Sequence, residues 1–145
     1  MIFVTVGTHK QSFNRLLEEV DNLVANNKIK EKVIMQIGHS TYEPRNVEWF
    51  RFIDFNRFKK IYKTARIIIT HGGAGSIIDA LSNNKPVIAV PRLKRFNEHV
   101  NNHQLDLTNM LVRYKRISSV YNINELNKAI LKIKKINILK SKRIH

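Results

Sequence analysis

Short apolar runs alternate with helical stretches along most of this 145-residue chain. The runs are rich in β-branched residues and are bounded by glycine, threonine or proline, which is typical of buried strands. Strands that are apolar throughout and alternate with helices favour an α/β fold, a parallel sheet of about five to six strands with helices on both faces. We expect these strands at residues 2–6, 33–37, 49–53, 66–70 and 86–91, with a short, weaker one within residues 113–120.

Helices are predicted where apolar residues recur every three or four positions. This spacing occurs over residues 13–24, 55–62, 77–81, 100–112 and 126–133. Asn122 and Glu125 stand three apart just before the last of these helices, which is the arrangement of an N-terminal capping box. The sequence shows no internal repeat, linker or second domain, so we expect one domain over residues 1–135 and a basic C-terminal tail over residues 136–145.

The composition is that of a globular protein, with 43% hydrophobic residues. The chain contains no cysteine, which excludes disulfides and thiolate metal sites and fits a reducing cytosol. The N-terminus lacks the features of a signal peptide, and no apolar run approaches the roughly 20 residues that span a bilayer. We therefore expect a cytoplasmic protein.

The formal net charge is +15, from 26 basic and 11 acidic residues. This excess has two interpretations: a solvated surface without a specific partner, or contact with an anion such as a nucleotide, a nucleic acid or a membrane lipid. No acidic residue follows Glu125, whereas lysine and arginine accumulate there, which suits an anionic membrane surface. Nucleic acid is less favoured, because no DNA- or RNA-binding motif is visible.

The glycine-rich segment Thr70–Ser76 is the most informative motif. It follows an apolar run, precedes a predicted helix and holds three of the five glycines in the chain. A strand, a glycine turn and a helix N-terminus form an anion-binding arrangement, because backbone N–H groups approach the anion and the helix dipole attracts it. A purely structural turn is the alternative. The segment is not a Walker A loop, and it follows the fourth strand, whereas a dinucleotide fingerprint follows the first.

Two polar residues beside this turn have both structural and functional interpretations. Asp79 lies one turn into the predicted helix, where a carboxylate either complements the helix N-terminus or accepts hydrogen bonds from a ribose diol. His71 is either a capping or packing residue or a ligand contact, and the pattern assigns it no proton transfer.

A second polar cluster follows the predicted fifth strand. Its carboxylate and carboxamide side chains, including Glu98, Asn102 and Gln104, are groups that read sugar hydroxyls; a solvated helix start is the alternative. His99 and His103 have a spacing able to hold a metal, but the other features of a zinc-protease helix are absent. The sequence also has no Asp-x-Asp pair, so we expect no metal site.

Ligands of open α/β sheets bind beyond the carboxyl ends of the strands. Four segments fall at such ends: Gly7-Thr8, Gly38-His39, His71–Gly75 and Pro91-Arg92. We therefore expect them to converge on one edge of the sheet.

Three segments together resemble one family. They are residues 2–8 followed by Phe13, the glycine segment 71–76, and Pro91-Arg92 with Glu98-His99 and Asn102-His103-Gln104. The chain resembles the C-terminal, donor-binding half of glycosyltransferase family 28, a group that includes MurG and the catalytic subunit of the dolichol-linked UDP-GlcNAc transferase. In length and motif pattern it is similar to the small stand-alone bacterial subunits of the PssE type.

The resemblance implies a Rossmann-like domain that is one half of a GT-B fold and binds a UDP-sugar without a metal or other cofactor. The glycine segment would face the diphosphate, and Asp79 stands where many members carry a ribose-binding glutamate. No catalytic residue is assigned. The implied substrate-binding residues are Gly7, Thr8, His71, Gly72, Gly73, Ala74, Gly75, Ser76, Asp79, Arg92, Glu98, Asn102 and Gln104.

Full-length members also have an acceptor-binding N-terminal half, which this sequence lacks. The resemblance therefore implies a partner, a membrane-anchored acceptor-binding subunit of the PssD type, at the inner face of the cytoplasmic membrane. The implied reaction is inverting transfer of a hexose from a UDP-sugar to a lipid-linked saccharide acceptor in exopolysaccharide or capsule synthesis. The alternative is a non-catalytic enhancer of a partner glycosyltransferase.

Overall fold

The computed structural model describes residues 1–71, 74–98 and 117–133. In this part of the chain, six strands form one sheet in the order β3-β2-β1-β4-β5-β6, and every neighbouring pair is parallel. This is the doubly wound order, in which the direction of winding reverses between β1 and β4. The strands are β1 (Ile2–Thr5), β2 (Val33–Gln36), β3 (Glu48–Phe50), β4 (Ile67–Thr70), β5 (Val87–Ala89) and β6 (Ile117–Ser119).

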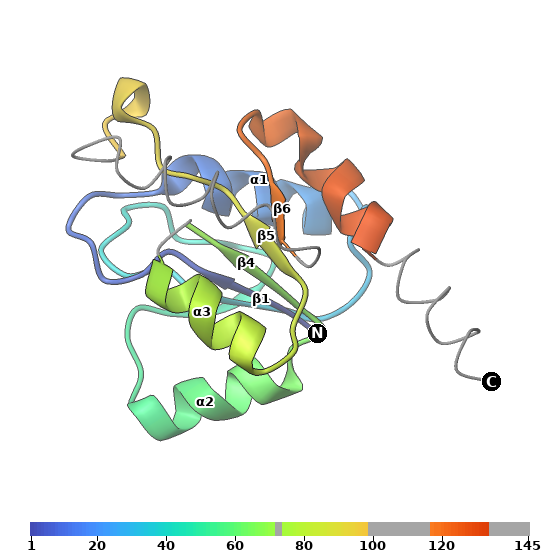
Figure 1. The fold of residues 1–145 in the computed structure, drawn as a ribbon. Coiled ribbons are helices and arrows are strands. Elements are labelled where there is room, and N and C mark those ends of the chain that lie inside the picture. The colour runs from blue at the N-terminus through green and yellow to red at the C-terminus, as the bar shows by residue number, and fades with distance from the viewer. Residues whose placement is uncertain (72–73, 99–116, 134–145) are drawn as a thin grey trace.

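Helices cover both faces of the sheet, as the sequence predicts (Figure 1). On one face lie α1 (Asn14–Ala25) and the helical residues 126–133; on the other lie α2 (Phe55–Thr64) and α3 (Ala74–Ser82). Two short 3-10 helices, η1 (Lys94–Phe96) and η2 (Ile123–Glu125), lie in the connections. Each face has its own apolar core, because alternate residues of the strands point to opposite sides: Val4 packs under α1, and its neighbour Phe3 packs under α2.

Several boundaries differ from the predicted ones. The third strand ends at Phe50, before the predicted end at residue 53, because the chain must turn into α2, whose N-cap Asp54 accepts a hydrogen bond from the Arg57 amide at 3.0 Å. Helix α3 begins at Ala74 and not at the predicted residue 77, so that Gly75 and Ser76 already belong to its first turn. The predicted helix over residues 100–112 lies outside the described residues.

The predicted capping box is only half formed. The Asn122 side chain accepts a hydrogen bond from the Asn124 amide at 3.1 Å, whereas Glu125 contributes its backbone amide, which donates to the Asn122 carbonyl at 2.9 Å. Among the described residues, no helix combines the length and the hydropathy that crossing a bilayer requires.

Candidate functional site

The carboxyl ends of β1, β2 and β4 meet in a tight arrangement that depends on two glycines. Gly7 has a φ of +76° and Gly38 a φ of +55°, a backbone region that favours glycine. A Cβ atom on Gly38 would lie 2.7 Å from the Gly7 carbonyl oxygen, and one on Gly7 would lie 2.6 Å from Nε2 of His71. The predicted convergence on one edge of the sheet is therefore confirmed for Gly7, Gly38 and His71, whereas Gly72 and Gly73 lie outside the described residues.

Gln36, the last residue of β2, connects the segments that follow β1 and β3 through hydrogen bonds. Its Oε1 accepts hydrogen bonds from the Thr5 hydroxyl at 2.6 Å and from the Gly7 amide at 3.1 Å. Its Nε2 donates to the carbonyls of Gly7 at 3.0 Å and Arg51 at 2.9 Å. The side chain is buried and uses both ends of its amide, so it fixes the loop after β1 relative to the ends of β2 and β3.

A pocket of about 470 Å³ opens at this edge of the sheet. It combines polar groups from the strand ends with Ser76 in the first turn of α3 and with Phe52, whose ring is 49% exposed. The pocket thus offers hydroxyls, an imidazole and an aromatic surface next to a helix N-terminus, where anions are favoured. Its lining residues are Thr5, Gly7, Thr8, His9, Gln36, Phe52, Ile53, Phe58, His71 and Ser76.

His71 is buried in the wall of this pocket and is neutral at physiological pH. Burial, and then the positive charge of Arg92, lower the pKa of its imidazole to about 4. A neutral imidazole donates from one nitrogen and accepts at the other. Its Nδ1 and the hydroxyl of the neighbouring Thr70 are buried without a hydrogen-bond partner among the described residues.

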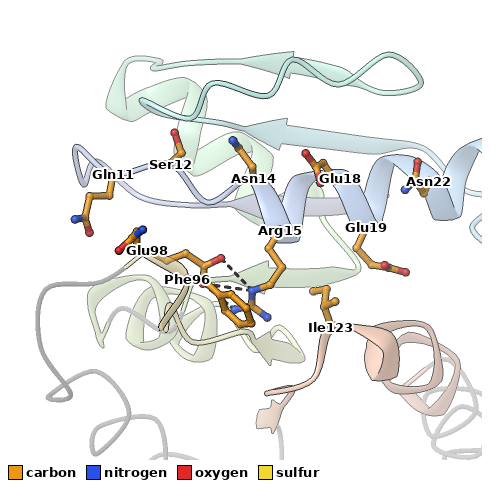
Figure 2. A pocket seen from close by; sticks show the side chains of 11 residues that line it. Gln11, Ser12, Asn14, Arg15, Glu18, Glu19, Asn22, Phe96, Glu98 and Ile123 are labelled. Carbon is orange, nitrogen blue, oxygen red and sulfur yellow. Dashed lines mark hydrogen bonds and ion pairs between the residues drawn. The ribbon is translucent and has the colours of Figure 1, made fainter. Parts of the chain in front are cut away.

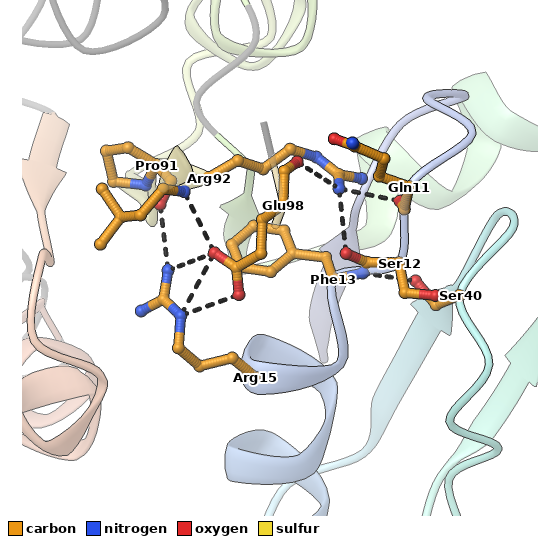
Figure 3. A network of polar contacts seen from close by, with 9 residues as sticks. Gln11, Ser12, Phe13, Arg15, Ser40, Pro91, Arg92 and Glu98 are labelled. Atoms are coloured by element: carbon orange, nitrogen blue, oxygen red, sulfur yellow. Dashed lines mark hydrogen bonds and ion pairs between the residues drawn. The ribbon is translucent and has the colours of Figure 1, made fainter. Parts of the chain in front are cut away.

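Arg92, which follows β5, is fully buried. Its guanidinium stacks over the Phe13 ring at 5.0 Å, and burial lowers its pKa to about 10, so it remains charged at neutral pH. Figure 3 shows how this side chain reaches back to the segment before α1. At 2.8 to 3.3 Å it donates to the backbone carbonyls of Val6, Gln11, Ser12 and Glu98.

Glu98 forms a buried ion pair with Arg15 of α1 (Figure 3). The Arg15 Nη2 lies 2.9 Å from one carboxylate oxygen and its Nε lies 3.0 Å from the other, and the side chains are only 14% and 5% exposed. The Leu93 amide donates to the same carboxylate at 3.1 Å. The carboxylate is therefore committed to holding the loop after β5 against α1.

A second cavity, of about 590 Å³, lies between α1 and the loop after β5 (Figure 2). Arg15 and Glu98 lie in its wall, and the guanidinium of Arg15 is 5.0 Å from the centre of the Phe96 ring. Gln11 and Ser12 line this cavity, whereas Thr8 and His9 line the pocket at His71, so the loop after β1 contributes to both.

The structure brings together only part of the predicted binding set. Gly7, Thr8, His71 and Ser76 line one pocket. Asp79 is exposed and lines a small groove between α2 and α3 together with Phe55, Tyr62 and Asn83, outside that pocket. The backbone of Ala74 and Gly75 lies in the first turn of α3, and Arg92 and Glu98 form the buried supports described above. Gly72, Gly73, Asn102 and Gln104 lie outside the described residues.

Sequence reasoning missed Gln36, Phe52 and Arg15. A signal existed for Gln36, a polar residue within the otherwise apolar run of residues 33–37. Phe52 stood in a predicted strand, where an aromatic residue is unremarkable. Arg15 pairs with a residue 83 positions away, which no local pattern reveals. No group of three or more histidine and carboxylate side chains able to hold a metal occurs in the described ranges.

A parallel sheet in this order, with a polar pocket at the carboxyl ends of its strands, defines a Rossmann-like ligand-binding domain. The sequence model of the glycosyltransferase family 28 C-terminal domain matches residues 1–142, and the chain belongs to this family.

Curated relatives carry the same domain in much longer proteins. The human UDP-N-acetylglucosamine transferase subunit ALG13 is 37% identical over 120 residues, which are 76% of this chain and 10% of the relative. The subunit of the same name from Candida albicans is 29% identical over 93 residues, 64% of this chain and 30% of the relative. The chain therefore spans less than a third of either relative.

Solved glycosyltransferases share the fold. The glycosyltransferase of kitacinnamycin matches with a TM-score of 0.70 and 17% identity, over 91% of this chain and 34% of that chain. MurG from Acinetobacter baumannii matches with a TM-score of 0.63 and 16% identity, over 90% of this chain and 40% of that chain. The fold of this chain is thus that of one half of a GT-B glycosyltransferase, as the resemblance implied.

Proposed function

We propose that this chain is the donor-binding subunit of a two-component glycosyltransferase that transfers a hexose from a UDP-sugar to a lipid-linked acceptor. The observation that carries the proposal is the pocket at the N-terminus of α3, where Gly7, Thr8, His71 and Ser76 meet. It lies in a domain of a glycosyltransferase family, at the sheet edge where α/β proteins bind their ligands.

The chemistry of the pocket supports a nucleoside diphosphate. The N-terminus of α3 attracts the diphosphate, and a neutral His71 has an N–H to donate to a phosphate oxygen without carrying a charge of its own. The Nδ1 of His71 is buried without a hydrogen-bond partner among the described residues, so no described protein group competes for this nitrogen. The exposed ring of Phe52 offers a surface on which a uracil base stacks.

The reaction proposed is a single inverting displacement. The acceptor hydroxyl attacks the anomeric carbon, the bond from that carbon to the diphosphate oxygen breaks, and UDP leaves with the bonding electrons. Fixed N–H dipoles around the diphosphate stabilise the charge that develops on it, and positioning contributes the rest. In line with the resemblance to family 28, we propose that the donor is used without a metal.

The proton of the acceptor hydroxyl must pass to a general base, which we propose the partner subunit supplies. No carboxylate lines the described part of the pocket, and the pKa of both histidines in its wall, His9 and His71, is lowered. The partner proposed is membrane-anchored and acceptor-binding, of the PssD type, acting in exopolysaccharide or capsule synthesis at the inner face of the cytoplasmic membrane. Because the curated relatives are named UDP-N-acetylglucosamine transferase subunits, UDP-N-acetylglucosamine is the first donor to test.

The commitment of Glu98 to Arg15 favours a second candidate, a non-catalytic enhancer. In that case the chain would bind and activate a partner that holds the donor itself.

A transfer assay separates these functions. Purified chain is added to membranes that contain the partner, with radiolabelled UDP-N-acetylglucosamine and EDTA, and lipid-extractable label is counted. We expect label only when both subunits are present, and a large loss with Gln104→Ala, whose position matches a family sugar contact. Asn26→Ala, an exposed amide at the C-terminal end of α1, is the control and should transfer normally. Undiminished transfer with both Gln104→Ala and Gly73→Asp would support the enhancer instead.

A further inference from the structure

Helix α2 exposes an aromatic ring that does not belong to either apolar core. Phe55, its first residue, is 69% exposed, more than any other large apolar side chain in the described residues. The helix packs on the sheet through other residues, chiefly the buried Tyr62 with Phe58 and Ile61. A single exposed ring is ordinary on a protein surface, but a ring at the beginning of a lysine-rich surface helix is favourable at a membrane interface.

Helix α2 also carries three exposed lysines, one of which lies next to this ring. Lys59, Lys60 and Lys63 lie on the outward side of α2, and the Lys59 ammonium is 5.1 Å from the centre of the Phe55 ring. Lys85 joins them, because its Nζ donates to the Lys63 carbonyl at 2.6 Å. None of these four ammonium groups pairs with an acid among the described residues, whereas Arg57 is paired with Asp54.

The opposite face of the molecule is less suited to an anionic surface. It carries Lys128 and Lys132 beside the exposed Leu131, but α1 on the same face adds Glu18 and Glu19, which an anionic surface would repel. The α2 side also has an acidic residue, the exposed Asp79 in the groove beside Phe55, and a second exposed ring, Phe96, has Arg95 over it at 4.9 Å. Among the described residues, the α2 side combines an exposed ring with several lysines that have no acidic partner.

The surface formed by Phe55, Lys59, Lys60, Lys63 and Lys85 also adjoins the pocket at His71. Helix α2 follows directly on Phe52 and Ile53 in the pocket wall, and Phe58 lines both that pocket and the groove next to Phe55. A membrane in contact with Phe55 would therefore lie beside the pocket opening.

We propose that α2 docks the chain directly on an anionic lipid bilayer, with Phe55 in the interface and with Lys59, Lys60, Lys63 and Lys85 on the headgroups. The contact is a property of this chain alone, separate from the partner subunit, the basic C-terminal tail and donor binding. It would hold the donor pocket at the surface from which a lipid-linked acceptor approaches.

Vesicle co-sedimentation tests the proposal. The full chain is mixed with phosphatidylcholine vesicles that contain phosphatidylglycerol, and separately with pure phosphatidylcholine vesicles. We expect salt-sensitive binding to the anionic vesicles only. Lys59→Glu, Lys60→Glu and Lys63→Glu together should lower binding roughly a hundredfold, since each lysine near an anionic surface is worth about fivefold.

The matched control is Lys28→Glu, Lys128→Glu and Lys132→Glu, three exposed lysines away from α2. It changes the net charge equally and should retain binding within about threefold, because screening confines the attraction to charges near the bilayer. Phe55→Ser, which changes no charge, should weaken binding about tenfold through lost apolar burial.

Two results would overturn the proposal. Equal losses of binding in both triple variants would show that net charge alone attracts the chain to the vesicles. Absence of wild-type binding to the anionic vesicles would show that the chain does not dock on lipid directly. UDP binding by the same variants, measured without lipid, should be unchanged, which separates this test from that of the donor site.

Discussion

Gly7 and His71 approach so closely that a methyl group on Gly7 would stand 2.6 Å from the imidazole Nε2. The two residues follow β1 and β4, which are neighbours at the centre of the sheet. The loop after β1 therefore lies directly against His71, the first residue of the glycine segment 71–76. The shape of the pocket depends on this contact, since the loop and the histidine both form its wall.

Gly7→Ala should damage both stability and donor binding. Alanine would have to adopt a φ of +76° and displace the His71 ring, so we expect a loss of at least about 2 kcal/mol in the free energy of unfolding. UDP affinity should fall at least tenfold. Urea denaturation and calorimetric titration measure the two effects. Thr8→Ala, on the same exposed loop but without a positive φ, should leave stability unchanged; equal stability of Gly7→Ala and Thr8→Ala would show that the close approach is not required.

Phe52→Ala should weaken UDP binding without unfolding the chain. The ring is 49% exposed in the pocket wall, so its removal costs little core packing and mainly removes a stacking surface. We expect a loss of roughly tenfold in UDP affinity, which is about 1.4 kcal/mol and lies within the range of about 1–3 kcal/mol found for one stacked base. Phe55→Ala removes an equally large ring outside that pocket and should bind UDP like the wild type. If both variants bind UDP normally, Phe52 does not stack on the base.

The Glu98–Arg15 pair should prove structural. Removing either partner leaves the other charge buried without compensation. Glu98→Ala and Arg15→Ala are therefore each expected to lower the free energy of unfolding by about 3 kcal/mol. The double variant should lose much less than the sum of the two, and a double-mutant cycle measured by urea denaturation gives the coupling. The pair between Arg57 and Asp54, with side chains 74% and 59% exposed, is the control and should show coupling close to zero. Additive losses for Glu98 and Arg15 would mean that the buried pair is not formed in solution.

Stability should fall in mild acid because of His71. Its pKa is lowered to about 4 in the folded chain, so between the unfolded value of 6.5 and about 4 only the unfolded state takes up the proton. Unfolding is thereby favoured as the pH falls through this window, by about 2 kcal/mol between pH 7.5 and pH 5. His9, whose pKa is also lowered by burial, acts in the same direction. Urea denaturation gives the free energy of unfolding at each pH, and this free energy should depend less steeply on pH in His71→Asn than in the wild type. If the two slopes are identical, the imidazole of His71 is exposed to solvent in the folded chain.

Much of the fold was predictable because its information is local. The β-branched run at residues 67–69 and the periodic apolar residues of α1 each specify an element within a few positions, and the order of elements then specifies a parallel sheet. The edge on which Gly7 and His71 meet follows from that topology alone. The start of α3 was misplaced by three residues, because glycine disfavours a helix and yet Gly75 is accommodated in its first turn.

The side chains that hold the loops around the pocket were less predictable, because their positions depend on contacts between segments that are distant in the sequence. The spacing of Asp79 places it one turn into a helix, but only the packing of α2 against α3 decides that it lines their groove. Glu98 was predicted as a substrate-binding residue from its polar neighbours and from the family resemblance, but its ion pair with Arg15, 83 residues earlier in the chain, could not be predicted from any local pattern. Gln36 and Arg92 hold backbone atoms of loops whose proximity exists only after the sheet has formed.

Calorimetric titration of the purified chain with UDP, in the presence of EDTA, tests the proposed donor site most directly. We predict one site per chain with micromolar affinity in the wild type. Gly73→Asp, which places a carboxylate in the segment matched to the diphosphate, should abolish binding by charge repulsion. Ser82→Asp, which adds the same charge at the far end of α3, should leave it intact. Equal UDP affinity in Gly73→Asp and the wild type, or no binding by the wild type, would contradict the assignment of this pocket to a UDP-sugar.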